Sequence, residues 1–126
     1  MTDTFQLFDL RIVVEAIRGT CTCGHQVGDS FELQGGQLSL PGPNRSFCMY
    51  ALQSALPLLP AKQRPLQPAD WMQTDTRVVC PDPLCGVVMR IDRTTPRELH
   101  HGDVSAVPLP NPAGGGEQDV DASRAY

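Results

Sequence analysis

Residues 7–17 read LFDLRIVVEAI, and their alternation decides the fold class. Every second position is apolar, and these positions are Phe8, Leu10, Ile12, Val14 and Ala16. The opposite face carries Asp9, Arg11 and Glu15. A period of two together with β-branched residues is typical of a half-buried strand. We therefore expect the folded part of the chain to begin with a β-strand that ends at Gly19.

Shorter extended runs follow this strand, at residues 30–33, 37–40, 76–80 and 86–92. Gly35-Gly36 separates the first two runs and is typical of a two-residue hairpin turn. The stretch 81–85 is rich in turn residues and separates the last two runs, which predicts a second hairpin. The sequence thus predicts an antiparallel arrangement for most of the sheet.

A single segment has a convincing helical pattern. Ser46 is a suitable N-cap residue. Apolar residues then recur at helical spacing, at Cys48, Ala51, Leu52, Ala55, Leu56 and Leu59. Pro57 and Pro60 lack the backbone N–H that an uninterrupted helix needs, so we expect the helix to end near Leu56.

These elements predict one small α+β domain over residues 4–93, with about five mainly antiparallel strands and one principal helix packed on the sheet. The proline-rich connector 62–70 leads into Trp71 and Met72, which we expect to form a hydrophobic plug. Residues 94–126 are rich in proline, glycine and acidic residues. Such a segment buries too little apolar surface to offset its ordering entropy, so a disordered tail is expected.

Composition excludes several classes of protein. The net charge is −4 and nine of the ten basic residues are arginines without a basic cluster, which argues against a nucleic-acid-binding surface. No apolar run reaches the ~20 residues of a membrane span. The start Met1-Thr2-Asp3-Thr4 lacks the features of a signal peptide. We therefore expect a cytoplasmic protein, in which five cysteines serve as thiols, metal ligands or redox groups rather than as disulfides.

Cysteine and histidine residues occur in three elements that can meet at one end of the sheet. The loop after the first strand, the helix start and the second hairpin carry Cys21, Cys23, His25, Cys48, Cys80 and Cys85. Four ligands of the Cys₂His₂ or Cys₃His type suit tetrahedral Zn²⁺. This arrangement predicts a metal site.

The spacing leaves alternatives open. Neither Cys21-x-Cys23 nor Cys80-x₄-Cys85 matches the usual Cys-x-x-Cys pair of a zinc module. Cysteines are also common as small buried apolar residues, and Cys48 shares the apolar stripe of the expected helix.

A reactive thiol is a further alternative. Cys48 lies near the expected helix N-terminus, where a thiolate is favoured. His25 is then the candidate base, with Asp29 or Asp82 as the orienting group. Asp29 and Asp82 also have a simpler interpretation, because aspartate side chains commonly accept hydrogen bonds within their own turns.

Three motifs together resemble a family of small bacterial proteins of uncharacterised activity. They are Gly19-x-Cys21-x-x-Gly24-His25-x-Val27-Gly28-Asp29-x-Phe31, Phe47-Cys48-x-Tyr50-Ala51-Leu52 and Val79-Cys80-Pro81-Asp82-Pro83. The resemblance covers roughly residues 7–93. It implies a set of pattern residues, namely Cys21, His25, Asp29, Cys48, Cys80 and Asp82. Cys23 and Cys85 lie outside that pattern, so the resemblance favours a metal site built from Cys21, His25, Cys48 and Cys80.

The leading hypothesis is a small metal–thiolate protein that binds Zn²⁺. One alternative is a thiol-dependent enzyme or sulfur carrier that uses a Cys/His pair. Another is a non-catalytic accessory subunit that binds a larger enzyme through Trp71 and Met72 or through the proline connector. A protein partner or a homo-oligomer is possible in each case, and the sequence names no substrate.

Overall fold

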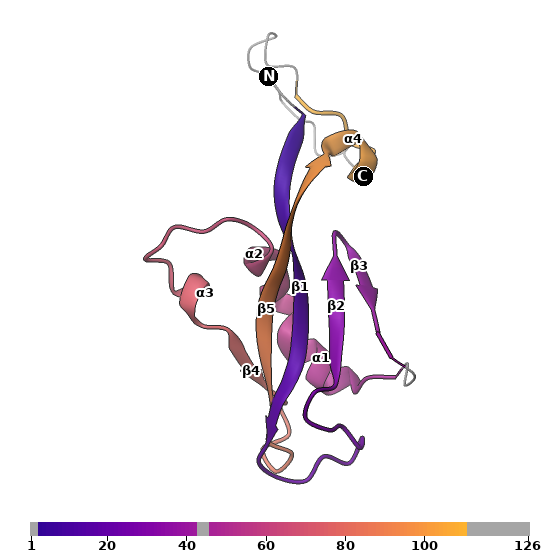
Figure 1. Cartoon of the computed structure of the whole chain (residues 1–126), viewed down its shortest axis with the longest axis vertical. Coiled ribbons are helices and arrows are strands. Elements are labelled where there is room, and N and C mark those ends of the chain that lie inside the picture. The colour runs from indigo at the N-terminus through magenta and orange to yellow at the C-terminus, as the bar shows by residue number, and fades with distance from the viewer. Residues whose placement is uncertain (1–2, 43–45, 111–126) are drawn as a thin grey trace, which may run out of the picture. The chain divides into compact units, whose positions relative to one another are not determined.

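The computed structural model describes residues 3–42 and 46–110 (Figure 1). The chain divides into two compact units. The larger unit covers residues 6–97, and the smaller one contains residues 3–5 and 98–110 of the described chain. No helix in the described ranges is long and apolar enough to cross a bilayer.

A five-stranded sheet in the order β3-β2-β1-β5-β4 forms the framework. The strands are β1 (Thr4–Ile17), β2 (Ser30–Gln34), β3 (Gln37–Ser39), β4 (Arg77–Val79) and β5 (Val87–His100). Strand β1 pairs with β2, β2 with β3 and β4 with β5, and these three pairings are antiparallel. A few short helices accompany the sheet, so the predicted α+β class is confirmed.

The first hairpin has the expected turn. Gln34 pairs with Gln37 across Gly35-Gly36, and Gly35 has a φ of 59°, a left-handed conformation that favours glycine. Within the sheet, Ile12 lies opposite Phe31, and both side chains are buried. The alternation in residues 7–17 therefore directs the expected face of β1 into the core.

Strand β5 extends further than the sequence indicated. The apolar alternation fades after Asp92, yet the strand continues to His100. The extension is held by contacts distant in sequence: the Thr94 hydroxyl donates to the carbonyl of Asp9 at 3.2 Å, and Arg97 Nε donates to the Asp9 carboxylate at 2.7 and 2.8 Å. A local pattern carries no information about such contacts. Residues 111–126 of the expected tail lie outside the described residues.

The predicted helix is a chain of three short pieces. They are α1 (Met49–Ala55), the 3₁₀ helix η1 (Leu56–Leu58) and α2 (Leu59–Lys62). The N-cap position of α1 is Cys48, so the prediction of Ser46 as N-cap is wrong. The regular helix does end before Leu56, as expected. The helical path nevertheless continues, because Pro57 and Pro60 occupy the first positions of new helical segments, where no N–H is needed.

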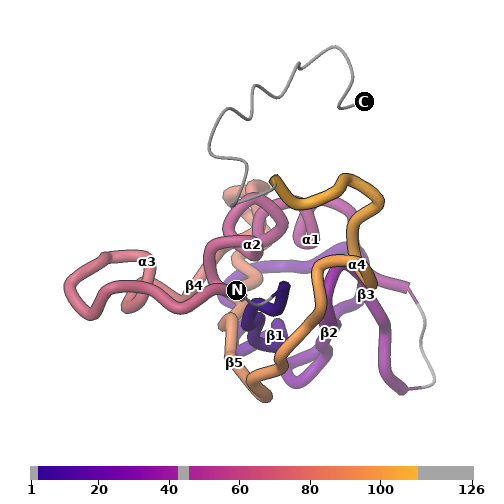
Figure 2. The backbone as a smooth tube through the Cα atoms, turned by 90° about the horizontal axis from the view of Figure 1, so that it is seen from above, coloured from indigo at the N-terminus to yellow at the C-terminus, as the bar shows by residue number. Residues whose placement is uncertain are grey.

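The core lies between the sheet and one helical layer. Figure 2 shows α1 and α2 together on one face of the strands. The central residues of this core have almost no exposed surface, and they are Leu10, Ile12, Val14, Phe31, Ala51, Ala55, Leu59, Val87 and Met89. Burial of each large side chain stabilises the fold by about 1.5–3 kcal/mol.

The connector between α2 and β4 carries the short helix α3 (Trp71–Thr74) and extends to the side of the sheet (Figures 1 and 2). The Trp71 side chain is 64% exposed, so the prediction of a hydrophobic plug is wrong for it. A buried lysine anchors the connector instead. Lys62 is 2% exposed, and its ammonium donates to the carbonyl oxygens of Met72 and Asp75.

The smaller unit has one short helix, α4 (His101–Val104). The backbone N–H of His101 donates to the carbonyl of Asp3 at 2.7 Å, and the exposed His100 ring lies 3.3 Å from the Asp3 carboxylate. These contacts join the start of β1 to the end of β5 within this unit.

Candidate functional site

The end of β1 is joined to the tip of the second hairpin by backbone hydrogen bonds. Arg18, Gly19 and Thr20 donate to the carbonyls of Gly86, Cys85 and Leu84 at 2.9, 3.1 and 3.0 Å. Gly19 is required for this approach, because a Cβ at that position would lie 2.0 Å from the Leu84 carbonyl oxygen. These three hydrogen bonds bring the loop that carries Cys21 and Cys23 next to Cys85.

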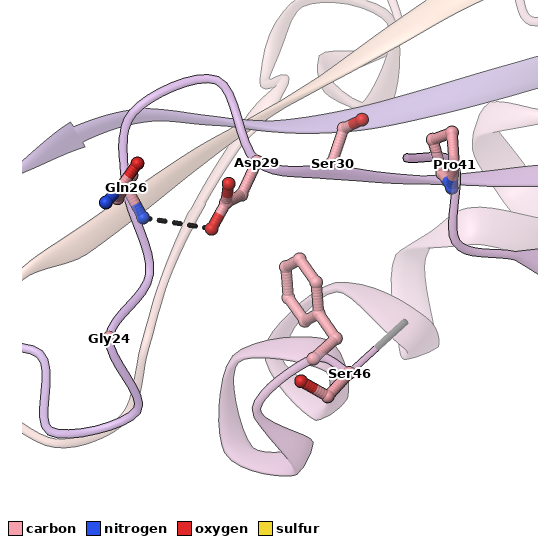
Figure 3. Close-up of a pocket in the computed structure, with 7 residues that line it drawn as sticks. Gly24, Gln26, Asp29, Ser30, Pro41 and Ser46 are labelled. Atoms are coloured by element: carbon pink, nitrogen blue, oxygen red, sulfur yellow. Dashed lines mark hydrogen bonds between the residues drawn. The ribbon is translucent and has the colours of Figure 1, made fainter. Parts of the chain in front are cut away.

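The same loop returns to β1 before it enters β2. Gly28 donates to the carbonyl of Val14 at 2.9 Å, and Val14 donates to the carbonyl of Asp29 at 2.8 Å. The Asp29 carboxylate accepts the backbone N–H of Gln26 at 2.9 Å (Figure 3). The expected role of Asp29 within its own turn is therefore confirmed.

His25 is held by contacts on both ring nitrogens. Its Nε2 accepts the backbone N–H of Cys48 at 3.0 Å, so that nitrogen carries no proton. In a neutral ring the proton then lies on Nδ1, which is 3.3 Å from the Asp29 carboxylate. The ring also packs on Phe47, with centroids 4.3 Å apart, and its side chain is 5% exposed. His25 thus fixes the start of α1 to the loop.

All five cysteines line one pocket of about 420 Å³. They come from the loop after β1, the N-cap of α1 and the second hairpin. The full lining consists of Cys21, Thr22, Cys23, Cys48, Tyr50, Cys80, Pro81, Asp82 and Cys85. The structure brings these three elements together at one site, as expected.

The exposure of the thiols differs across the pocket. Cys23 is exposed, and Cys21 and Cys48 are half-buried. Cys80 and Cys85 are buried. A reagent in solution therefore has the easiest access to the thiols of the loop and the helix start.

Cys23 and Cys48 interact through their thiols. Burial raises the pKa of Cys48, but the N–H groups of Ala51 and Tyr50 and the Cys23 thiol outweigh that effect and hold the pKa below its ordinary value. The Cys48 side chain forms no cap hydrogen bond at the start of α1, but these N–H groups still lower its pKa. The hydrogen bond to Cys48, with a contribution from burial, raises the pKa of Cys23. The two thiols thus shift in opposite directions, the pKa of Cys48 downward and that of Cys23 upward.

Cys80 and Cys85 form a second pair. Burial is the main cause that raises the pKa of Cys85 to about 11, and its hydrogen bond to Cys80 acts in the same direction. Asp82 lies in the turn between them, where its carboxylate accepts the backbone N–H of Leu84 at 3.0 Å. This contact confirms the turn role expected for Asp82.

The candidate ligands are thus only partly brought together. Cys21, Cys48 and Cys80 share the pocket, whereas His25 does not line it and directs Nε2 at the main chain of Cys48. Within residues 3–42 and 46–110, no three Cys, His, Asp or Glu side chains are gathered closely enough to hold a metal ion as they stand.

Two cysteines had little weight in the sequence interpretation. Cys23 and Cys85 lie outside the motifs, yet each lines the same pocket as the motif cysteines, and the pKa of each is raised by a motif thiol, Cys48 and Cys80 respectively. The signal that could have identified them is position alone: each lies within five residues of another cysteine in the same loop or turn.

A second pocket, of about 320 Å³, lies beside the same loop (Figure 3). Its lining consists of Gly24, Gln26, Asp29, Ser30, Pro41, Ser46 and Phe47. Phe47 connects it to the core, because its ring also packs edge-on against Phe31 with centroids 5.0 Å apart. His25 and Phe47 therefore link the loop to both the helix start and the core.

Comparisons with protein-family models, with curated proteins and with solved structures gave no match to this chain. Fold and site together define the class: a small α+β protein with a five-thiol pocket at one end of its sheet. The resemblance to a family of small bacterial proteins stays a prediction from the three motifs.

Proposed function

We propose that this chain is a small metal–thiolate protein and that its ion is Zn²⁺. The observation that carries the proposal is the position of all five thiols around one pocket. Zn²⁺ takes four sulfur or nitrogen ligands in a tetrahedral arrangement, and thiolates are its preferred soft donors. A five-stranded domain with a modest core also gains stability from an ion that ties a loop, a helix and a hairpin together.

The proposed ligand set differs from the sequence prediction in one member. Cys21, Cys48 and Cys80 stay as ligands. His25 would have to give up its bond from the Cys48 N–H to bind a metal. Cys23 and Cys85 line the pocket already, so one of them is the better fourth ligand. Among the described residues, no three potential ligands lie close enough together to hold an ion. Metal binding would therefore have to bring the cysteine thiolates closer to one another.

The test is metal binding by untagged, reduced protein. We expect near one equivalent of Zn²⁺ after purification without chelator, with bound thiols that resist alkylation until a chelator is added. Co²⁺ substitution should give the sulfur-to-metal charge-transfer absorption of a thiolate site. No metal together with five freely alkylated thiols would overturn the proposal.

Single variants identify the ligands. Cys21→Ser, Cys48→Ser and Cys80→Ser should each abolish the Co²⁺ absorption, while circular dichroism verifies that each variant is folded. His25→Gln is the matched control, and it should keep the absorption if all ligands are cysteines. Loss in His25→Gln but not in Cys23→Ser or Cys85→Ser would restore the ligand set with His25.

A second candidate function is a thiol-dependent enzyme or sulfur carrier. The lowered pKa of Cys48 supports a nucleophile at that position. The Cys/His form of this hypothesis lacks support, because the His25 lone pair is directed at a backbone N–H rather than at a thiol. Metal-free protein with one rapidly alkylated cysteine would favour this candidate.

The third candidate is an accessory subunit. The exposed Trp71 on the connector supports it, since large exposed aromatic side chains are common in protein interfaces. A larger enzyme or a second copy of the chain would be the partner, and association that Trp71→Ala abolishes would test it. For all three candidates we place the protein in the cytoplasm, where reduced thiols are maintained, and we propose no nucleic-acid or membrane partner.

A further inference from the structure

A pocket of about 510 Å³ lies where the connector meets strand β5. Its lining consists of Lys62, Gln73, Thr76, Ile91, Asp92 and Arg93. The Ile91 N–H donates to the Thr76 carbonyl at 2.8 Å, which joins β5 to the end of the connector. This pocket shares no lining residue with the five-thiol pocket, so an inference about it does not depend on the metal–thiolate proposal.

Two cations in this lining are held by neutral oxygen atoms. The buried Lys62 ammonium donates to the carbonyls of Met72 and Asp75. The Arg93 guanidinium donates to the carbonyls of Lys62 and Arg64 at 2.8 and 3.0 Å. In the described part of the chain no carboxylate forms an ion pair with either cation, so two positive charges lack a directly bound counter-ion there.

The charges around the pocket favour an anion. Burial is the main cause that lowers the pKa of Lys62, and the nearby Arg93 guanidinium acts in the same direction. Two carboxylates of the connector act in the opposite direction. The carboxylate in the lining, Asp92, accepts from Arg90 Nε at 2.8 and 3.1 Å and therefore has its own cation. An anion in the pocket would offset the repulsion between Lys62 and Arg93.

The lining is also rich in hydrogen-bond donors. Within the described residues, the Lys62 ammonium uses two of its three N–H groups and the Arg93 guanidinium three of its five. The third Arg93 bond runs from Nη1 to the Gln73 side-chain oxygen at 3.0 Å, so the Gln73 amide nitrogen stays a donor. The Thr76 hydroxyl can donate as well. These donors come from four segments, which suits a tetrahedral anion better than a planar carboxylate.

We propose that this pocket binds a phosphate group, either as inorganic phosphate or as the phosphate of a small monoester. Lys62 supplies a compact positive charge and Arg93 a planar guanidinium, the two kinds of side chain that bind phosphate most often. Gln73 and Thr76 donate to the remaining oxygens. The observation that carries the proposal is the presence of two cations without a bound carboxylate at one pocket.

The test titrates the full chain with inorganic phosphate at constant ionic strength and follows assigned amide signals by NMR. We expect saturable shifts at Gln73, Thr76 and residues 91–93. Shifts that rise without saturation, or that centre elsewhere, would overturn the proposal. Glycerol 3-phosphate is the second probe, and whichever of the two binds more tightly identifies the source of the phosphate group. Acetate is the third, and acetate binding as tight as that of phosphate would overturn the choice of a tetrahedral anion.

Variants provide the second arm. Lys62→Met should weaken phosphate binding about tenfold or more, because a charged partner is lost. Thr76→Val should also weaken it, while it keeps the side-chain shape and the backbone bond from Ile91. Arg64→Met is the matched control, since it removes a positive charge but no side chain of the lining, and it should bind phosphate like the unaltered protein.

The two lining variants separate ligand contact from a loosened connector. Weaker binding in both, with the fold verified by circular dichroism, supports the proposal. Weaker binding in Lys62→Met alone, with Thr76→Val unchanged, would overturn it, because the connector and not the ligand contact would then be affected. The Co²⁺ absorption of the thiol pocket is measured on the same variants and should be unchanged, so failure of either proposal is seen independently of the other.

Discussion

His25 Nε2 accepts the backbone N–H of Cys48 at 3.0 Å, which joins a loop to a helix start 23 residues further along the chain. This bond uses the lone pair that a metal or a thiol proton would need. It makes His25 a structural support for the cysteine pocket, since Cys48 is the N-cap of α1 and also lines that pocket.

Replacing His25 by Ala should therefore lower stability. The Cys48 N–H would lose its acceptor, which costs about 1–3 kcal/mol when the group is partly buried. Urea denaturation followed by circular dichroism measures the change. His100→Ala is the control, because that ring and its Asp3 partner are largely exposed, and it should change stability by no more than about 0.5 kcal/mol. Equal effects of the two variants would contradict the supporting role.

Gly19→Ala should disturb the backbone hydrogen bonds that join the end of β1 to the second hairpin. The added Cβ would lie 2.0 Å from the Leu84 carbonyl oxygen, so the backbone has to shift, and we expect a loss of about 1–3 kcal/mol. Gly36→Ala is the matched control, since a Cβ there meets nothing within 4 Å. Thermal denaturation compares the two. A Gly19→Ala protein as stable as the Gly36→Ala protein would show that the close approach is not required.

Alkylation of Cys48 should depend on pH in a way that reflects its neighbours. The thiolate is the reactive form, and a lowered pKa moves the rise in rate to lower pH than for an ordinary cysteine. Cys23→Ala removes a hydrogen-bond donor to the thiolate, so the pKa of Cys48 should rise and the profile should shift to higher pH. Mass-resolved alkylation with iodoacetamide measures the rate at each site.

The same experiment contains its own comparison. Cys85, with a pKa of about 11, should react slowly across the neutral range in folded protein. Thr22→Ala alters a neighbouring lining residue without removing a thiol, and it should leave the Cys48 profile unchanged. A shift in Thr22→Ala as large as that in Cys23→Ala would refute the specific role of the Cys23 donor.

Lys62→Met should loosen the connector that carries α3. The substitution keeps most of the buried volume but removes the donor to the carbonyls of Met72 and Asp75, for an expected loss of about 2 kcal/mol. Amide hydrogen exchange should become faster around α3 before the sheet is affected. Arg64→Met is the control, because its hydrogen bond to the Pro60 carbonyl is exposed. The prediction fails if exchange in α3 is the same in both variants.

Trp71→Ala should change the stability of the isolated protein by less than about 0.5 kcal/mol, because the side chain is mostly exposed. Phe31→Ala, at a buried position opposite Ile12, should lower stability by about 3–5 kcal/mol. Urea denaturation of both variants gives the contrast. A large effect of Trp71→Ala would mean that the tryptophan is packed in solution, as the sequence alone suggested.

Much of the sheet could be predicted because its signals are local. The alternation in β1, the Gly35-Gly36 turn and the runs of β2 and β4 each lie within a few residues, and backbone geometry converts them directly into strands and turns. The end of α1 was likewise predictable, since Pro57 lacks an N–H. The end of β5 was not, because Thr94 and Arg97 are held by Asp9 more than eighty residues away.

The sequence by itself determined which segments would carry the thiols and that these segments could meet at one end of the sheet. Only the tertiary structure decided what each group does there. It directs His25 at the main chain of Cys48, places all five thiols around one pocket, buries Lys62 and exposes Trp71. The physical reason is that hydrogen bonding and burial depend on neighbours far along the chain, whereas residue type and spacing report only on the local backbone.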